Sequence, residues 1–461
     1  MKSPRFVSRF SVPRYGQAGG EPLKSSVDKE DAMSNAHFRS KSIVPRLLLL
    51  LAAVLGLLVI TPQPAQAQTL TTLYSFTGMP DGAAPYAGVI MDAQGNLYGT
   101  TQYGGAGICT AGYMPGCGTV FKLTPGGTET IIFNKFSRHS GSPSSGLIWD
   151  ASGNLYGTTG EYCWYPRNRR FCTTSGTVFE LRKLKKRIEV KWLYRFSYDD
   201  GTDPMGGLVM DGQRNLYGTT SSGGAYSAGT VFELTPAGTE TVLHSFAGGS
   251  DGENPEAGLT RDAQGNLYGT TVGGRFPCAG SGCGAVFMVT PGGSETVLYS
   301  FTGGTDGSYP LAGLVLDPQG NLYGTTWAGG GSTCNSGEGC GVVFELTAGG
   351  TETVLYSFCP QYPNCTDGAG PTGNLLLDAQ GNLYGATIKG GAYGQGAVFE
   401  LTPAGQETVL YSFTGGTDGA DPGGNLILNA QGNLYGTTVR GGIVGGNCGS
   451  SGCGTVFKLT P

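Results

Sequence analysis

The sequence predicts an all-β protein whose chain forms a seven-bladed β-propeller with four-stranded blades. The first observation behind this prediction is composition, because glycine supplies 83 of the 461 residues while charged residues make up only 13%. This excludes a helical bundle, a coiled coil and collagen, and the 10% of aromatic residues argues against disorder. The other two observations are a sevenfold repeat and four short β-rich runs in each copy, a pattern typical of all-β folds with many glycine turns.

Two short motifs mark the repeat and always alternate in the same order. Asn-Leu-Tyr-Gly and Val-Phe each occur seven times, at a spacing of about 50 to 60 residues. Such a period decides the fold, because each copy is one structural unit. The first motif begins at Asn96, Asn154, Asn215, Asn266, Asn321, Asn382 and Asn433, and the second at Val120, Val178, Val231, Val286, Val343, Val398 and Val456.

The fifth copy shows the four β-rich runs, which are separated by turn-forming Gly, Pro, Asn and Asp. They span Glu295–Phe301, Gly313–Asp317, Asn321–Thr326 and Gly341–Leu346. Four strands in each of seven copies fit a propeller, with a solenoid as the alternative for a repeat of this size. No capping repeat occurs at either end, which favours a closed ring. Similarity to other propeller repeats places the Gly-Leu-x-x-Asp run innermost and the Glu-Thr-Val-Leu-Tyr-Ser-Phe run outermost.

The two ends of the repeat region predict how the ring closes. The first run, Leu70–Phe76, is of the outermost type, and the last run, Thr455–Leu459, is of the third type. The two runs therefore complement each other as parts of one blade. We expect the N-terminal strand to pair in the last blade, which removes an exposed sheet edge.

The recurring turn residues have structural explanations. In the segment Asp92-Ala93-Gln94-Gly95-Asn96 the aspartate can accept hydrogen bonds from nearby backbone N–H groups, and glycine supplies a positive φ. The segment 402–405 turns between the third and fourth runs. A metal held by the ring of recurring aspartates is the alternative. The glycines lack the strand–loop–helix context of a phosphate-binding loop.

Residues 1–67 differ from the repeats and are predicted to form a signal peptide with an extended N-terminal region. Three basic residues precede the apolar run Leu47–Ile60, and Ala65-Gln66-Ala67 supplies a small-x-small cleavage site. A transmembrane anchor is the alternative, but 14 apolar residues rise only about 21 Å as a helix. We expect a propeller domain over residues 68–461, secreted or at the cell surface, that contacts the membrane only through an uncleaved signal segment.

The charge balance bears on partners. Residues 1–67 hold nine of the 28 Lys and Arg residues and four of the 33 Asp and Glu residues. Residues 68–461 therefore contain 19 basic and 29 acidic residues, which gives a net charge of −10. A mildly acidic domain of this kind is a poor candidate for nucleic-acid binding.

The twelve cysteines form six close pairs, five of them between the second and third runs of a copy and one between copies. In an exported protein this predicts six local disulfides that stiffen long loops. The alternative, a zinc site, needs ligands from two pairs, and these pairs lie in separate repeats. The pairs are Cys109/Cys117, Cys163/Cys172, Cys278/Cys283, Cys334/Cys340, Cys359/Cys365 and Cys448/Cys453.

Few residues offer catalytic chemistry. Beyond the leader only His139 and His244 remain, and His244 replaces the tyrosine of an outermost run, which predicts a packing role. No Gly-x-Ser-x-Gly elbow and no His-x-x-x-His pair occurs. We expect no catalytic residue, no cofactor and no metal. An acidic pair for glycoside cleavage stays open, because aspartates recur between copies, at Asp81, Asp203, Asp251, Asp306, Asp367 and Asp418.

The second repeat carries the candidate binding site. Loops between second and third strands share one propeller face with the loops between blades, and these are the long, variable loops in which function is expected. Aromatic and arginine side chains are enriched at binding hot spots. The alternative is that the aromatic residues pack under their own loop. The candidate ligand-binding residues are Trp164, Tyr165, Arg167, Arg169, Arg170, Phe171 and the irregular inter-blade residue His139.

The repeat resembles the GloVer tandem repeat of secreted bacterial proteins. Its segments ETVLYSF, GNLYGTT and GxVFxLT, as at Glu407, Gly432 and Gly396, carry the resemblance over about residues 70–461. The resemblance implies an exported protein, often attached to the surface by a C-terminal sorting signal, and implies no activity. This sequence departs from that pattern because it ends at Pro461 without a sorting tail.

We therefore expect a secreted or cell-surface binding scaffold, with a carbohydrate or an envelope protein as its partner. An extracellular propeller enzyme, a polysaccharide lyase or hydrolase, is the alternative, and a purely structural envelope role is the third.

Overall fold

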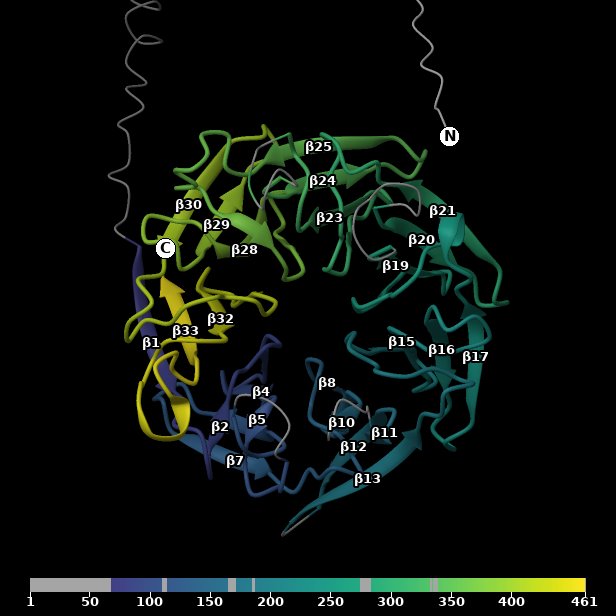
Figure 1. The fold of residues 1–461 in the computed structure, drawn as a ribbon, viewed down its shortest axis with the longest axis vertical. Coiled ribbons are helices and arrows are strands. Elements are labelled where there is room, and N and C mark those ends of the chain that lie inside the picture. Colours follow the sequence, from purple (N-terminus) through teal and green to yellow (C-terminus); the bar gives the residue numbers. More distant parts are fainter. Residues whose placement is uncertain are drawn as a thin grey trace, which may run out of the picture. The chain divides into compact units, whose positions relative to one another are not determined.

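The computed structural model describes residues 68–109, 114–164, 171–184, 187–273, 283–331, 334 and 339–460. Seven antiparallel sheets follow one another around a central axis (Figure 1). The predicted all-β, seven-bladed propeller is therefore confirmed. No helix among the described residues is long and apolar enough to cross a membrane.

Each of the first six blades places its strands in sequence order from the axis outward, as expected. From the innermost strand to the outermost, the first six blades are β3(Ile90–Met91), β4(Leu97–Thr101), β6(Thr119–Leu123), β7(Glu129–Phe133); β8(Ile148–Trp149), β9(Leu155–Thr159), β12(Thr177–Lys183), β13(Ile188–Arg195); β14(Val209–Met210), β15(Leu216–Thr220), β16(Thr230–Leu234), β17(Glu240–Ser245); β18(Thr260–Arg261), β19(Leu267–Thr271), β20(Ala285–Val289), β21(Glu295–Ser300); β22(Val315–Leu316), β23(Leu322–Thr326), β24(Val342–Leu346), β25(Glu352–Ser357); and β27(Leu376–Leu377), β28(Leu383–Lys389), β29(Ala397–Leu401), β30(Glu407–Ser412).

The seventh blade closes the ring with strands from both ends of the repeat region. Its order is β31(Ile427–Leu428), β32(Leu434–Thr438), β33(Thr455–Thr460) and then β1(Thr69–Ser75). Strands β1 and β33 pair antiparallel from Thr69 opposite Thr460 to Ser75 opposite Thr455, and they lie side by side in Figure 1. The predicted closure is confirmed, and the solenoid alternative is wrong because a solenoid leaves its first and last strands apart.

The core explains why the two marker motifs recur together. The phenylalanine of each Val-Phe motif is buried, and it lies against the glycine of the neighbouring Asn-Leu-Tyr-Gly motif. A Cβ atom at Gly99 would lie 2.6 Å from Cζ of Phe121. A side chain there would therefore displace the ring, so this glycine is fixed by packing rather than by its φ angle.

The aspartate turns take the structural role expected of them. Oδ1 of Asp92 accepts hydrogen bonds from the backbone N–H of Gln94 and Asn96, at 3.0 and 2.8 Å, and Oδ2 accepts from the Asn96 amide and the Tyr98 hydroxyl. Gly95 has φ +79°. Burial opposes ionisation of Asp92, but these four hydrogen bonds outweigh it and lower the pKa of its carboxyl group.

The innermost strands are shorter than the sequence suggested. The predicted run Gly313–Asp317 contains only β22, Val315–Leu316. Gly313 donates its backbone N–H to the side chain of Asn374 in the next blade, and Asp317 has entered its turn. Near the axis the blades are close enough to hydrogen-bond to one another, so these residues leave their own sheet.

Candidate functional site

One face of the propeller carries two sets of interlocked loops. The loop before each blade pairs with the loop that joins the second and third strands of that blade. In the first blade β2(Gly82–Ala83) pairs with β5(Tyr103–Gly104), and isolated bridges such as Ser308 with Ala328 repeat this arrangement elsewhere. The predicted common face of these loops is therefore present, and we call it the loop face.

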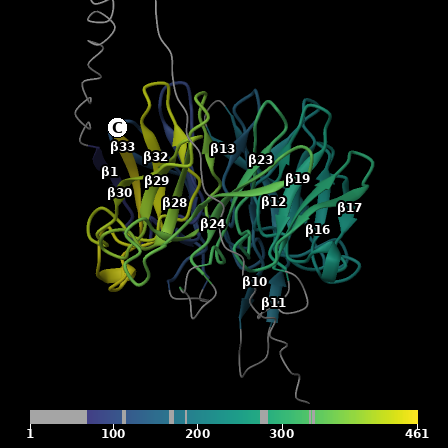
Figure 2. The ribbon, with the colours of Figure 1, turned by 90° about the horizontal axis from the view of Figure 1, so that it is seen from above.

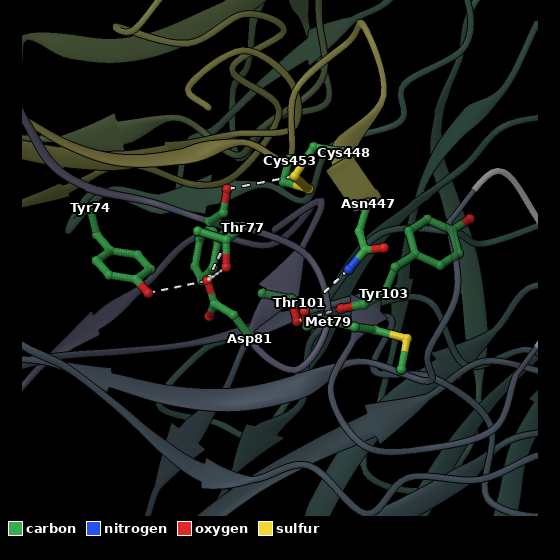
Figure 3. The surroundings of a disulfide bond; sticks show 10 residues. Tyr74, Thr77, Met79, Asp81, Thr101, Tyr103, Asn447, Cys448 and Cys453 are labelled. Atoms are coloured by element: carbon green, nitrogen blue, oxygen red, sulfur yellow. Dashed lines mark hydrogen bonds between the residues drawn. A yellow bond between two sulfur atoms is a disulfide. The ribbon is translucent and has the colours of Figure 1, made fainter. Parts of the chain in front are cut away.

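Disulfides reinforce the loop face. The bridges Cys109–Cys117, Cys334–Cys340, Cys359–Cys365 and Cys448–Cys453 form as predicted. Cys172 and Cys283 are also disulfide-bonded, while the side chain of Cys163 and the whole of Cys278 lie outside the described part of the chain, so those two pairings stay predictions. Figure 3 shows Cys448–Cys453 beside the first inter-blade loop, where Asn447 donates to the backbone oxygen of Met79 at 3.2 Å.

Two of the cysteine pairs converge, which the sequence argument missed. The sulfur atoms of Cys334, Cys340, Cys359 and Cys365 all lie within 4.8 Å of one another. Pairs in separate repeats are expected to stay apart, and for these two pairs that expectation is wrong. An inter-blade loop and the neighbouring loop between second and third strands meet on the loop face, and each contributes one pair.

The loop of the second repeat is described only in part. Tyr165, Arg167, Arg169 and Arg170 lie outside the described residues, and Trp164 and Phe171 are described by their backbone alone. The short strands β10(Tyr162–Trp164) and β11(Phe171–Thr174) pair, with Trp164 opposite Phe171, and they extend from the loop face in Figure 2.

His139 lies beside that loop. It is exposed, and its backbone oxygen accepts a hydrogen bond from Arg195. The backbone oxygen of the adjacent Arg138 accepts one from Thr173 of β11. The structure therefore brings His139 close to the strand that carries the loop. Whether the loop binds a ligand stays a prediction.

A cavity of about 430 Å³ lies on the axis and is lined by the innermost segments of all seven blades. The residue after the proline of each inter-blade loop enters this channel from the loop face. These residues break the repeat, because Tyr86, Met205, Glu256 and Leu311 are all different. The channel is symmetric in its backbone and asymmetric in its side chains.

A group of aromatic and cationic side chains on the loop face connects to this cavity through Tyr86, the member of the group that lines it. The Nζ atom of Lys389 lies 5.5 Å from the centre of the Trp327 ring, a cation–π distance. Tyr309 meets the same indole edge to face, with 6.4 Å between ring centres. A Cβ atom at Gly370 would lie 3.0 Å from the indole Nε1, so glycine there leaves room for the indole.

A charged pair continues this arc. Nη1 of Arg440 lies 3.1 Å from Oδ2 of Asp421. Burial raises the pKa of the Asp421 carboxyl, although Arg440 and Lys389 oppose the shift. Burial also raises the pKa of the channel-lining Tyr86, and the charges of Arg440 and Asp421 act on it as well. We call Tyr309, Trp327, Lys389, Asp421, Arg440 and Tyr86 the mouth arc.

The opposite side of the mouth is acidic. Burial raises the pKa of Glu256, and the negative charge of Asp203 raises it further. Oδ1 of Asp203 accepts the backbone N–H of Glu161 at 3.1 Å. The prediction that Asp203 is one of the recurring inter-blade aspartates is wrong. Asp200 takes that position, because it accepts the Tyr194 hydroxyl and the Ser197 backbone N–H.

The mouth residues have a sequence signal that appears only when the seven copies are aligned with one another. They occupy the residues on either side of the inter-blade proline and the two residues after the Asn-Leu-Tyr-Gly-(Thr/Ala)-Thr segment, positions that vary strongly between copies. The second repeat stands out because one whole loop is irregular, whereas these residues stand out only when equivalent positions of the seven copies are compared. Residues from four blades, 5, 6, 7 and 1, therefore escaped notice because each looks unremarkable within its own copy.

The sequence has no match among curated proteins. Among solved structures, an aldose sugar dehydrogenase of Streptomyces coelicolor in its PQQ-bound form shares 13% identity over 86% of this chain and 100% of its own, with a TM-score of 0.42. A gluconolactonase of Xanthomonas campestris shares 13% identity over 85% of this chain and 89% of its own, with a TM-score of 0.41. A luciferin-regenerating enzyme shares 13% identity over 86% of this chain and 95% of its own, with a TM-score of 0.39. Nothing about ligand or reaction transfers at these values.

The family comparison rests on the repeats themselves. The sequence profile of the Gloeobacter/Verrucomicrobia repeat matches residues 162–361 and 331–461. These matches span more than half of the chain and cover copies of the same blade unit that the structure shows. The chain belongs to the Gloeobacter/Verrucomicrobia repeat family.

Proposed function

We propose that this protein is an exported binding module that holds an anionic carbohydrate at the loop-face mouth of its central channel. The observation that carries the proposal is the convergence of unlike side chains from separate blades at one place. In a chain built from near-identical copies, positions that vary strongly between copies and lie together are the best candidates for a site. Oxidised cysteine pairs support export, because disulfides persist in oxidising compartments.

The chemistry of the mouth arc favours a sugar with a carboxylate. An indole ring offers a flat apolar face for a sugar ring. Trp327 is partly exposed and supplies this face, while the buried Tyr309 packs against the indole edge to face and holds it in place. Lys389 and Arg440 are cations in a domain whose residues 68–461 carry a net charge of −10. The Arg440 side chain is 62% exposed, and its planar fork has donors beyond those facing Asp421. A uronic acid would satisfy both the indole and the cations.

The test is a binding screen of the purified protein against oligosaccharides with and without uronic acid residues. Trp327→Ala and Arg440→Ala should each weaken retention of the anionic sugars at least tenfold, while the melting temperature stays within a few degrees. Tyr226→Ala is the matched control, because that tyrosine is 65% exposed on another loop of the same face. Binding should also fall with added salt, since exposed charges are screened. Unchanged binding by both mouth variants would exclude this site.

A second candidate function is supported by the acidic side of the mouth. A carboxyl group with a raised pKa beside a second carboxylate is the arrangement of a general acid and its partner, and Glu256 and Asp203 meet that description. We propose a polysaccharide lyase or hydrolase as the alternative. Product analysis of the same sugars separates the two, because Glu256→Gln should abolish cleavage and leave binding intact. Retention without products would favour the binding module.

A further inference from the structure

A contact between neighbouring blades recurs on the outer side of the loop face. The tyrosine near the end of an outermost strand donates its hydroxyl to an aspartate of the following loop, as Tyr299 does to Asp306 at 3.1 Å. A glutamate at the start of the next outermost strand faces the same aspartate, as Glu352 does. The Glu352 oxygen Oε1 is buried and has no hydrogen-bond partner. The hydroxyl contact occurs five times, from Tyr74, Tyr194, Tyr299, Tyr356 and Tyr411.

The junction between the third and fourth blades departs from this pattern in one residue. His244 replaces the tyrosine, and its Nε2 atom lies 3.2 Å from Oδ1 of Asp251. Its ring packs edge to face on Phe246 at 4.8 Å, where the tyrosines pack on the equivalent phenylalanines. The imidazole therefore keeps the packing role expected of it and adds a nitrogen ligand to the pair of carboxylates.

Three potential ligands meet here from three separate elements. One donor atom from each of His244 in β17, Asp251 in the turn Gly249–Asp251 and Glu295 in β21 lies within 4.8 Å of the other two. Glu295 Oε1 is buried without a hydrogen-bond partner. The aspartate is held in place, because its Oδ2 accepts the backbone N–H of Ala247 at 2.5 Å.

We infer that His244, Asp251 and Glu295 bind a divalent transition-metal ion, for which Zn²⁺ is the best match. One imidazole and two carboxylates are ligands that zinc accepts, and imidazole disfavours Mg²⁺ and Ca²⁺. Zinc–ligand bonds of about 2.0 to 2.2 Å place donors some 3.4 Å apart, which small side-chain rotations achieve from the observed arrangement. The ion would neutralise two carboxylates that face each other across a blade junction.

The exposure of the site agrees with metal entry. The His244 and Asp251 side chains are 20% and 23% exposed, so a water molecule can complete a tetrahedral shell. Because Glu295 belongs to the fourth blade and the other two ligands precede it, the bound ion would connect neighbouring blades. An ion that binds only the folded ring stabilises it.

The experiment uses untagged protein stripped of metal with EDTA, titrated with Zn²⁺ by calorimetry and checked by elemental analysis. A thiol assay on the same sample establishes that no cysteine is free to bind the ion. We expect one Zn²⁺ per chain and a rise in melting temperature on binding. His139→Ser is the matched control and should leave both unchanged, because that histidine lies in a different loop.

Two further variants make the result decisive. His244→Tyr restores the residue found at five equivalent positions, so it should fold normally and lose the bound ion. Tyr299→His should create a second site with Asp306 and Glu352 and raise the stoichiometry to two. Absence of Zn²⁺ binding by the parent protein would overturn the inference, and so would one equivalent retained by a folded His244→Tyr variant.

Discussion

The closure of the ring can be tested with one buried side chain. Phe76 follows β1, is fully buried, and packs edge to face on Phe121 with 5.1 Å between ring centres. It belongs to a cluster that includes Val456 of the last strand. Replacing Phe76 by alanine removes a ring from a closed core, which costs about 3 to 5 kcal/mol of unfolding free energy.

Two matched variants make this measurement interpretable. Phe246 holds the same place between the third and fourth blades, far from either end, and is also fully buried. Phe246→Ala should therefore lose a similar free energy. Thr71 lies on β1 and is exposed, so Thr71→Ala should change the free energy by less than about 0.5 kcal/mol.

The assay is urea unfolding followed by tryptophan fluorescence and circular dichroism, with coincident transitions as the condition for comparing free energies. If Phe76→Ala behaves like Thr71→Ala while Phe246→Ala is severely destabilised, the first strand contributes nothing to the fold. In that case the reasoning about closure is refuted.

The remaining predictions concern pH, turns, bridges and the leader. The pKa values of the glutamates at the blade junctions are raised from 4.5 to about 7, because burial and a neighbouring aspartate disfavour their charged form; they are Glu129, Glu240, Glu295 and Glu407. Because these pKa values are raised in the folded state, the stability that the glutamates contribute is complete below about pH 4.5 and is lost as the pH rises through 7. The melting temperature should therefore be higher at pH 5 than at pH 8. Glu240→Gln should reduce that difference. Asp317→Ala removes an acceptor of four hydrogen bonds and should lower the free energy of urea unfolding by about 1 to 3 kcal/mol. Asp317→Asn should cost less, because Asn429 accepts the equivalent backbone hydrogen bonds in the seventh copy. Non-reducing peptide mapping should return six local disulfides, and a Cys334–Cys365 peptide would contradict that pairing although these sulfurs lie only 3.8 Å apart. N-terminal sequencing of exported protein should begin at Gln68, and a start well before Leu47 would contradict cleavage after Ala67.

The repeat made the fold accessible to sequence reasoning. Seven occurrences of the same motifs average out local ambiguity, so the blade number, strand order and closing strand were all correct. The shortest strands were not, because β22 loses residues to contacts with other blades, such as the bond from Gly313 to Asn374. Contacts between copies leave no periodic signal within a copy.

The candidate site was harder for the same reason. Tyr309, Trp327, Lys389 and Arg440 come from different copies and meet only because the ring brings equivalent positions around one axis. The convergence of Cys334 and Cys365 was missed in the same way. A sequence read copy by copy shows which residues vary, and the symmetry of the ring is needed to show which of them become neighbours.

The pairing of β1 with β33 also has a consequence for how the protein is made. The strand synthesised first finds its partner only when the strand synthesised last is available, almost 390 residues later. Until then the growing arc has an unpaired edge at each end, and such edges favour association with other chains. Folding limited by this long-range contact should be slow, so a chaperone that shields the first strand would raise the yield more than one acting on the middle blades.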